Sequence, residues 1–141
     1  MQVVCILLVD DFEPFRLFVT SMIEKQPELQ VICEASDGLV AVQKADDLQP
    51  HLILLDIGLP TLGGIEAARQ MLVLAPQSRI LFVSQESSRA IVQAAFDLGA
   101  RGYVLKLDAG RELLPAINAV LRGDRYVSGG LAGHDFLTAA S

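Results

Sequence analysis

The amino-acid sequence predicts a three-layer α/β domain built on a parallel sheet of five strands. Two features predict it: five short apolar runs recur along the chain, and stretches with helical spacing separate them. A short, continuous apolar run is typical of a strand buried on both faces, as in a parallel sheet. Successive parallel strands are joined by right-handed crossovers, which place helices on both faces of the sheet.

The five expected strands cover residues 4–9, 31–35, 52–55, 80–83 and 103–105. Glu34 is the only charged residue in them. The run at residues 4–9 lies near the start of the chain, but no Lys or Arg precedes it and two aspartates end it, so a signal peptide is not expected. No run approaches the roughly 18 apolar residues of a membrane span. We therefore expect a cytoplasmic protein without a membrane partner.

Helices are expected between the strands. The clearest cover residues 15–23 and 113–121, where apolar side chains recur at i, i+3, i+4, i+7 and i+8, and weaker versions cover 39–48, 65–74 and 90–98. Gly99 and Gly123 stand where helices should stop, because glycine tolerates a positive φ. Pro115 leaves two alternatives: the last helix begins near Glu112, or it is kinked at the proline.

Composition and charge exclude several classes of protein. The chain has 141 residues, 52% of them hydrophobic, which suits one folded domain and excludes a largely disordered chain. Its formal net charge of -6 opposes binding of nucleic acid by this chain alone. Cys5 and Cys33 are expected as small buried residues rather than as a disulfide. We expect the domain to cover residues 1–123, followed by a flexible linker or tail, rich in Gly, at 124–141.

Polar side chains follow four of the five expected strands. Asp10 and Asp11 end the first, Asp56 the third, Ser84 the fourth and Lys106 the fifth. The carboxyl ends of parallel strands share one edge of the sheet, where α/β domains bind their ligands. If the first and third strands are neighbours, three carboxylates converge and require a cation to balance them. Mg²⁺ is the cation that suits a few carboxylate oxygens completed by water or phosphate.

This set of side chains suits phosphoryl transfer to a carboxylate. A carboxylate beside Mg²⁺ and a lysine can attack phosphorus, while the metal and the ammonium stabilise charge on the transferred oxygens. Asp56 is the best nucleophile, because it stands alone at the end of the expected central strand. Asp10 and Asp11 suit a metal-holding pair, Lys106 supplies the second cation, and Ser84 can donate to a phosphate oxygen.

Each residue also has an ordinary structural explanation. Asp11 could cap the first helix, Ser84 could close a turn, Lys106 could be a solvated lysine, and Tyr103 could be a core aromatic with its hydroxyl satisfied. The joint placement of the polar residues at one edge argues for function. His51 and His134 have no His or Cys neighbour at ligand spacing, so no histidine metal site is expected. The Gly-rich loops that bind nucleotides are absent from the sequence.

The segments ILLVDD, LILLDIGLP, LFVS and GARGYVLK resemble the receiver domain of bacterial two-component response regulators, over about residues 3–123. The resemblance implies the flavodoxin-like (CheY-like) fold with strand order 2-1-3-4-5, and a sensor histidine kinase as partner. It implies the following site roles: Asp56 is the phosphoacceptor, Asp10, Asp11, Asp56 and the Gly58 carbonyl serve Mg²⁺, Ser84 and Lys106 engage the phosphoryl group, and Tyr103 is a switching aromatic.

Two further segments, LPTLGGIEAAR and RGDRYVS, are most similar to the NarL/FixJ class. Members of this class usually continue into a DNA-binding helix-turn-helix domain, which the roughly twenty residues after Arg122 cannot supply. The resemblance therefore implies transcriptional control through a further domain. A phosphorylation-dependent homodimer is a separate expectation, because one hydrogen bond is too weak to drive a complete switch. Two departures stand out: Gln85 replaces a commonly small residue and could narrow access to Asp56, and Leu107 replaces a common cis proline, so either isomer of the Lys106–Leu107 bond is open.

Three functions compete. The leading one is a signalling receiver that is phosphorylated and changes its protein contacts, and so is not an enzyme with an external substrate. The first alternative is a pseudo-receiver, an interaction module that never turns over phosphate. The second is a Mg²⁺-dependent aspartyl phosphatase. The phosphatase pattern has two aspartates one residue apart followed by threonine, whereas Asp10 and Asp11 are adjacent and Phe12 follows.

Overall fold

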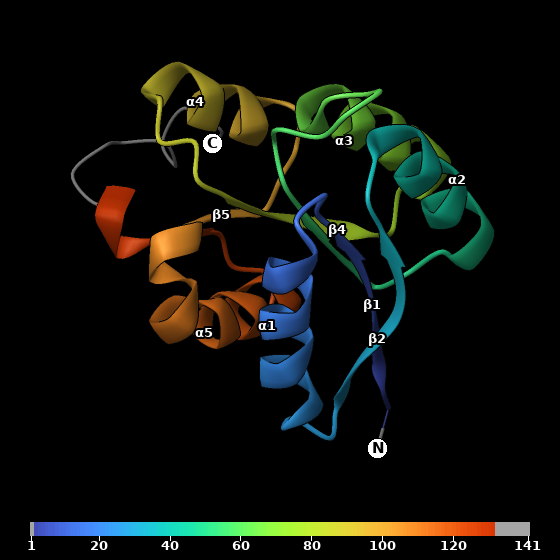
Figure 1. Cartoon of the computed structure of the whole chain (residues 1–141), viewed down its shortest axis with the longest axis vertical. Coiled ribbons are helices and arrows are strands. Elements are labelled where there is room, and N and C mark those ends of the chain that lie inside the picture. The colour runs from blue at the N-terminus through green and yellow to red at the C-terminus, as the bar shows by residue number, and fades with distance from the viewer. Residues whose placement is uncertain (1, 132–141) are drawn as a thin grey trace.

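A parallel sheet lies between two layers of helices in the computed structural model, which describes residues 2–131 (Figure 1). The strand order is β2-β1-β3-β4-β5-β6, and every neighbouring pair is parallel. The expected three-layer α/β fold and the order 2-1-3-4-5 are confirmed, and a sixth strand extends the sheet. The strands are β1 (Val4–Val9), β2 (Leu29–Ala35), β3 (Leu52–Leu55), β4 (Arg79–Ser84), β5 (Gly102–Leu105) and β6 (Tyr126–Val127).

Five α-helices connect and follow the first five strands in the described part of the chain. They are α1 (Glu13–Glu24), α2 (Gly38–Leu48), α3 (Gly64–Leu74), α4 (Arg89–Asp97) and α5 (Ala109–Leu121). Gly99 and Gly123 have φ values of 118° and 96°, which confirms them as helix stops. Helix α5 directly follows a 3-10 helix at Lys106–Asp108, so the alternative that it begins near Glu112 is wrong. Pro115 lies inside α5.

The sheet separates two apolar layers, because successive side chains of a strand point to opposite faces. Helices α1 and α5 cover one face, and α2, α3 and α4 cover the other (Figure 1). In β3, Leu52 and Leu54 pack toward α1 and α5, whereas Ile53 and Leu55 pack toward α2 and α3. All four side chains are buried. This two-sided burial explains why the strand is a continuous apolar run.

Residues 124–131, which we call the strap, differ from the prediction. A flexible linker or tail was expected from residue 124, but Tyr126 pairs with Gly102 and Val127 with Tyr103 along the edge of β5. A second 3-10 helix follows at Gly129–Leu131, and the Leu131 side chain is buried in the core. The prediction of a flexible segment is therefore wrong for the strap. Residues 132–141, which include His134, lie outside the described residues.

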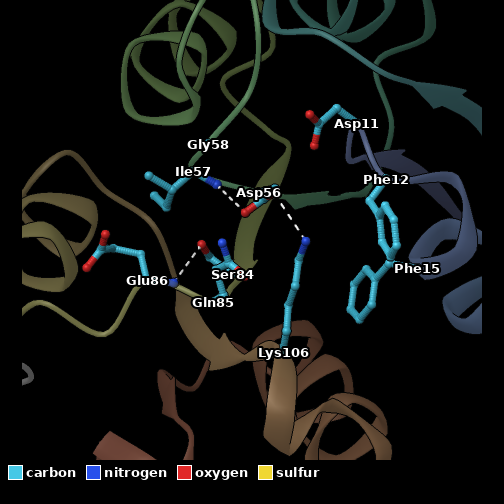
Figure 2. Close-up of a pocket in the computed structure, with 10 residues that line it drawn as sticks. All are labelled: Asp11, Phe12, Phe15, Asp56, Ile57, Gly58, Ser84, Gln85, Glu86 and Lys106. Carbon is cyan, nitrogen blue, oxygen red and sulfur yellow. Dashed lines mark hydrogen bonds and ion pairs between the residues drawn. The ribbon is translucent and has the colours of Figure 1, made fainter.

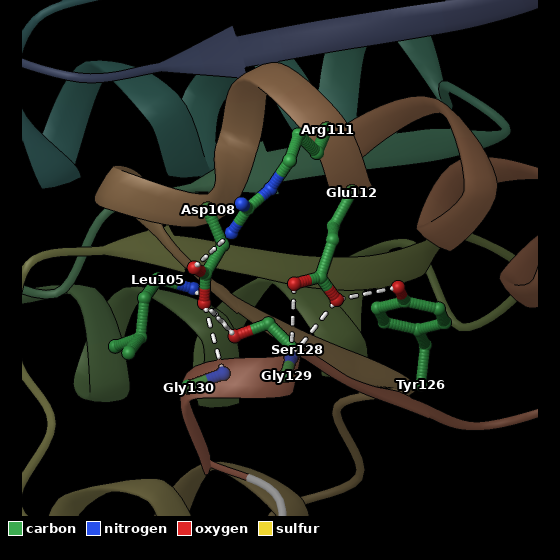
Figure 3. Close-up of polar contacts among 8 residues, drawn as sticks. All are labelled: Leu105, Asp108, Arg111, Glu112, Tyr126, Ser128, Gly129 and Gly130. Atoms are coloured by element: carbon green, nitrogen blue, oxygen red, sulfur yellow. Dashed lines mark hydrogen bonds and ion pairs between the residues drawn. The ribbon is translucent and has the colours of Figure 1, made fainter.

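Two carboxylates hold the strap in place (Figure 3). The buried Asp108 accepts hydrogen bonds from the Ser128 hydroxyl at 3.0 Å and from the Gly130 amide at 3.1 Å. Glu112 accepts from the Tyr126 hydroxyl at 2.7 Å and from the Gly129 amide at 2.9 Å. The strap is thus fixed by charge-assisted hydrogen bonds as well as by strand pairing.

Cys5 and Cys33 are free thiols in the structure, and both are only partly buried, so the expectation of two buried residues is wrong. Within residues 2–131, none of the helices combines the length and the apolar character that crossing a membrane requires.

Candidate functional site

The carboxyl ends of β1, β3, β4 and β5 bring the predicted polar residues to one edge of the sheet. Pairing of Val9 with Leu55 puts the residues after β1 and β3 side by side, and pairing of Ser84 with Leu105 does the same for β4 and β5. A pocket opens at this edge (Figure 2). It is lined by Asp11, Phe12, Phe15, Asp56, Ile57, Gly58, Ser84, Gln85, Glu86 and Lys106.

Three carboxylates meet beside the pocket. Ligand oxygens of Asp10, Asp11 and Asp56 all lie within 4.8 Å of one another, and no other cluster of metal-ligating residues occurs between residues 2 and 131. Asp10 and Asp56 are buried, whereas Asp11 is exposed. Burial raises the pKa of Asp10, and the negative charge of Asp56 adds to the effect, although hydrogen bonds from Lys106 and Phe12 oppose it. The cluster therefore favours a cation.

Lys106 supplies part of the compensating charge. Its Nζ lies 2.8 Å from Asp10 Oδ2 and 3.3 Å from Asp56 Oδ2. The same Nζ lies 4.7 Å from the centroid of the Phe15 ring, which shields it on one side. Burial alone would lower the pKa of Lys106, but its contacts with Asp10 and Asp56 outweigh burial, so the pKa is raised. Lys106 is charged and bound in the site, which excludes the alternative of a solvated lysine.

Asp11 does not cap α1. The N-cap residue is Phe12, whose main-chain N–H donates to Asp10 Oδ1 at 2.8 Å, and no side chain caps the helix. The carboxylate of Asp11 is instead directed into the pocket (Figure 2). The alternative of Asp11 as a capping residue is therefore wrong.

The donor set fits a hard divalent cation. Its three carboxylates offer only oxygen, the ligand type that Mg²⁺ prefers. Gly58 lies at the rim of the pocket, and no atom lies within 4 Å of the position that a Cβ would take there. A side chain at position 58 would thus meet no steric obstacle, and the carbonyl ligand role of Gly58 stays a prediction. Asp10, Asp11 and Asp56 can therefore hold a metal ion.

Ser84 and Tyr103 meet at the loop that follows β4. Ser84 Oγ accepts from the Glu86 amide at 3.2 Å, and the Tyr103 hydroxyl donates to the Glu86 carbonyl at 2.7 Å. The Tyr103 ring is fully buried, and burial raises the pKa of its hydroxyl to about 12. The contacts are those of a turn-closing serine and a core tyrosine with its hydroxyl satisfied. Both residues nevertheless hold the loop that borders the pocket.

The two departures noted in the sequence are placed at or near the site. Gln85 lines the pocket and is exposed, so narrower access to Asp56 stays a prediction. No cis peptide bond occurs between residues 2 and 131, so the Lys106–Leu107 bond is trans. The Leu107 side chain is 81% exposed and does not line the pocket.

Several residues at the site were not singled out from the sequence. The main-chain N–H of Ile57 donates to Asp56 Oδ1 at 2.7 Å. A Cβ at Gly64 would lie 2.0 Å from the Asp56 carbonyl oxygen, so only glycine lets α3 begin this close to the site. Arg16 donates to the main-chain carbonyl of Asp10 at 2.6 Å. The position of Arg16 near the start of α1, shortly after Asp10 and Asp11, was the available signal.

The fold and the acidic pocket define a class of protein, and comparison with known proteins agrees. The chain belongs to the response regulator receiver domain family, whose model matches residues 6–118. It is therefore a signalling domain of two-component systems, as the resemblance implied.

Particular relatives identify its branch as LuxR/NarL-type. The chain is 33% identical to the response regulator GacA of Pseudomonas syringae, over 87% of this chain and 58% of that protein. It is 33% identical to the transcriptional regulatory protein LiaR of Bacillus subtilis, over 91% of this chain and 61% of that protein. A crystal structure of a LuxR-family response regulator from Aurantimonas sp. superposes with a TM-score of 0.88 at 35% identity, covering 93% of this chain and 94% of that one. The chain thus spans roughly three fifths of these two curated relatives.

Proposed function

We propose that this protein acts in the cytoplasm and that its Asp56 accepts a phosphoryl group from a sensor histidine kinase, in a reaction that requires Mg²⁺. The observation that carries the proposal is the placement of Asp56 at the end of the central strand. There it contacts Lys106 at 3.3 Å and shares a cluster with two further carboxylates. Attack by an Asp56 carboxylate oxygen forms the new bond to phosphorus, and the bond to the kinase histidine nitrogen breaks, releasing neutral imidazole after protonation.

Asp10, Asp11, Asp56 and the Gly58 carbonyl would hold the Mg²⁺. When bound, the ion supplies positive charge that stabilises the transferred phosphoryl oxygens. Lys106, which contacts both Asp10 and Asp56, would provide an ammonium for the same oxygens. Ser84 Oγ accepts from the Glu86 amide, and its hydroxyl, which also makes a hydrogen bond with the Tyr103 side chain, would turn to donate to a phosphoryl oxygen.

The test is phosphorylation by a small donor. Incubation of the chain with acetyl phosphate and Mg²⁺ should add one phosphoryl group per chain, measured by intact mass, and the same mixture with a chelator should add none. The carboxylate cluster cannot accept a phosphoryl dianion without a cation, which is the reason for the requirement. No labelling with Mg²⁺ present would favour the pseudo-receiver. Release of phosphate from a panel of phosphomonoesters would favour the phosphatase.

We also propose that phosphorylation changes protein contacts through Ser84 and Tyr103. Both residues bind Glu86, so a phosphoryl group that draws on the Ser84 hydroxyl acts on the loop that holds Tyr103. The Tyr103 carbonyl in turn accepts from the Ser128 amide of the strap. To shift the ratio of active to inactive conformation from 1:99 to 99:1, phosphorylation must stabilise the active conformation by about 5.5 kcal/mol. One hydrogen bond supplies less than this, so a homodimer contact would contribute the remainder.

Amide NMR spectra with and without beryllofluoride, a phosphoryl mimic, test this switch. Changes are expected in the loop after β4, in β5 and in the strap, because hydrogen bonds connect these three segments. Changes confined to the immediate neighbours of Asp56 would contradict the switch. In the Tyr103→Phe variant, the spectral changes should extend less far from the loop after β4 toward β5 and the strap, because the variant lacks the hydroxyl that donates to Glu86.

The relatives support an output in transcriptional control. DegU of Brevibacillus brevis and LiaR of Bacillus subtilis are named transcriptional regulatory proteins, and this chain covers 52% and 61% of their lengths. The net charge of -6 opposes DNA binding by this chain alone. DNA recognition would therefore depend on a separate helix-turn-helix domain.

A further inference from the structure

Arg16 is a charged residue that lies beside the acidic cluster without lining the pocket. Its side chain is only 15% exposed. The guanidinium makes two directed contacts: Nη1 donates to the main-chain carbonyl of Asp10 at 2.6 Å, and Nε donates to Glu34 Oε1 at 2.9 Å. These contacts join the start of α1, the end of β1 and the end of β2.

The contact with the Asp10 carbonyl fixes the orientation of a whole peptide unit. The carbonyl of Asp10 and the amide of Asp11 belong to one rigid plane, so holding the oxygen also fixes the direction in which the chain enters Asp11. The other polar atoms of Asp10 are already bonded. Its amide donates to the Ala35 carbonyl, and its carboxylate accepts from the Phe12 amide and Lys106.

Asp11 depends on this backbone constraint more than Asp10 does. Its side chain is exposed and caps no helix, yet one of its carboxylate oxygens lies within 4.8 Å of oxygens of Asp10 and Asp56. An exposed aspartate has several rotamers of similar energy, so its contribution to a metal site depends on where its Cα and Cβ are held. The peptide held by Arg16 sets that position.

The geometry requires arginine. Nε and Nη1 leave the planar guanidinium in different directions, and each meets its own acceptor. A lysine ammonium at this position would be a single point on a flexible stem. Glu34 stands on β2, whose register to β1 is fixed by the pairing of Glu34 with Leu8. The acceptor that orients Arg16 is therefore carried by the sheet.

We propose that Arg16 is a positioning residue for Mg²⁺: it strengthens metal binding by holding the Asp10–Asp11 peptide, with Glu34 as its anchor. This inference rests on the proposed Mg²⁺ site. It makes a prediction opposite in sign to that of a simple charge effect. If Arg16 acted only as a nearby positive charge, its removal would strengthen binding of a divalent cation. Loss of a positioning contact weakens metal binding, by about 10- to 100-fold for partners of metal ligands.

The experiment is a titration with MgCl2 at constant ionic strength, followed by the amide resonances around Asp11. Arg16→Gln and Arg16→Lys should both weaken Mg²⁺ binding, by about tenfold. Glu34→Ala should weaken it in the same direction but less, because it frees Arg16 without removing it. Arg69→Gln is the matched control: it breaks an Arg–Glu pair of 2.7 Å on α3, outside the pocket, and should leave Mg²⁺ binding unchanged.

The outcomes separate this inference from the proposed function. If the wild type binds Mg²⁺ and the variants Arg16→Gln and Arg16→Lys bind it equally or more tightly, the role of Arg16 is overturned and the proposed function stays intact. No Mg²⁺ binding by the wild type would overturn both. Glu34→Ala keeps the inference testable if the Arg16 variants do not fold, and unchanged affinity in Glu34→Ala would then overturn it.

Discussion

Replacing Asp56 with asparagine should abolish phosphorylation by acetyl phosphate, the largest effect that we expect from any single substitution. An amide oxygen lacks the negative charge needed to attack phosphorus. Labelling of Asp56→Asn should therefore fall to the level seen for the wild-type chain in the presence of a chelator. The fold should survive, because the asparagine oxygen can still accept from the Ile57 amide. Intact mass after incubation with acetyl phosphate and Mg²⁺ measures the effect. Full labelling of Asp56→Asn would show that phosphorylation occurs elsewhere.

Ending the chain at Gly123 should have the largest effect on stability. The shortened chain loses burial of Leu131, worth about 1.5–3 kcal/mol, and leaves the buried Asp108 without its Ser128 and Gly130 donors, costing about 1–3 kcal/mol. A loss on the order of 4 kcal/mol is a large part of the 5–15 kcal/mol typical of a domain. Urea denaturation of this chain against one that ends at Leu131 measures the contribution of the strap alone.

A second variant separates the two causes. Asp108→Asn in the chain ending at Gly123 removes a charge that has lost its two donors from the strap and keeps only Arg111 at 3.4 Å, so it should recover part of the lost stability. In the chain ending at Leu131, the same substitution should destabilise, because the Asp108 carboxylate there accepts two hydrogen bonds from the strap. Equal unfolding free energies for the two chain lengths would show that the strap contributes nothing.

Most of the fold and the core of the site could be predicted, because both follow from local patterns. Strand β3 is an uninterrupted apolar run since both of its faces are covered, and such runs are recognisable without knowing what covers them. The site needed one further step, that the carboxyl ends of parallel strands share an edge. Combined with the strand order that the family resemblance implies, that step brings Asp10, Asp11, Asp56 and Lys106 together.

The features that could not be predicted all depend on partners far away in the sequence. A strand as short as Tyr126–Val127 carries no periodicity, and the small residues of the strap have the composition of a linker. Its order comes from Asp108 in the 3-10 helix before α5 and from Glu112 in α5. The partner of Arg16 on β2 is likewise hidden, because nothing in the local sequence connects position 16 with Glu34.

The strap also determines how the sheet can meet other proteins. An uncovered edge strand presents unpaired amides and carbonyls, and so is a template for pairing with a foreign strand and for aggregation. The strap occupies that edge of β5 with the protein's own backbone and leaves only the two residues of β6 as a new edge on this side. Growth of the sheet into a neighbouring molecule is therefore restricted on this side to the two residues of β6. A partner that approaches here has to bind through side chains of the helices or displace the strap, and displacement would deprive Asp108 of two of its hydrogen-bond donors.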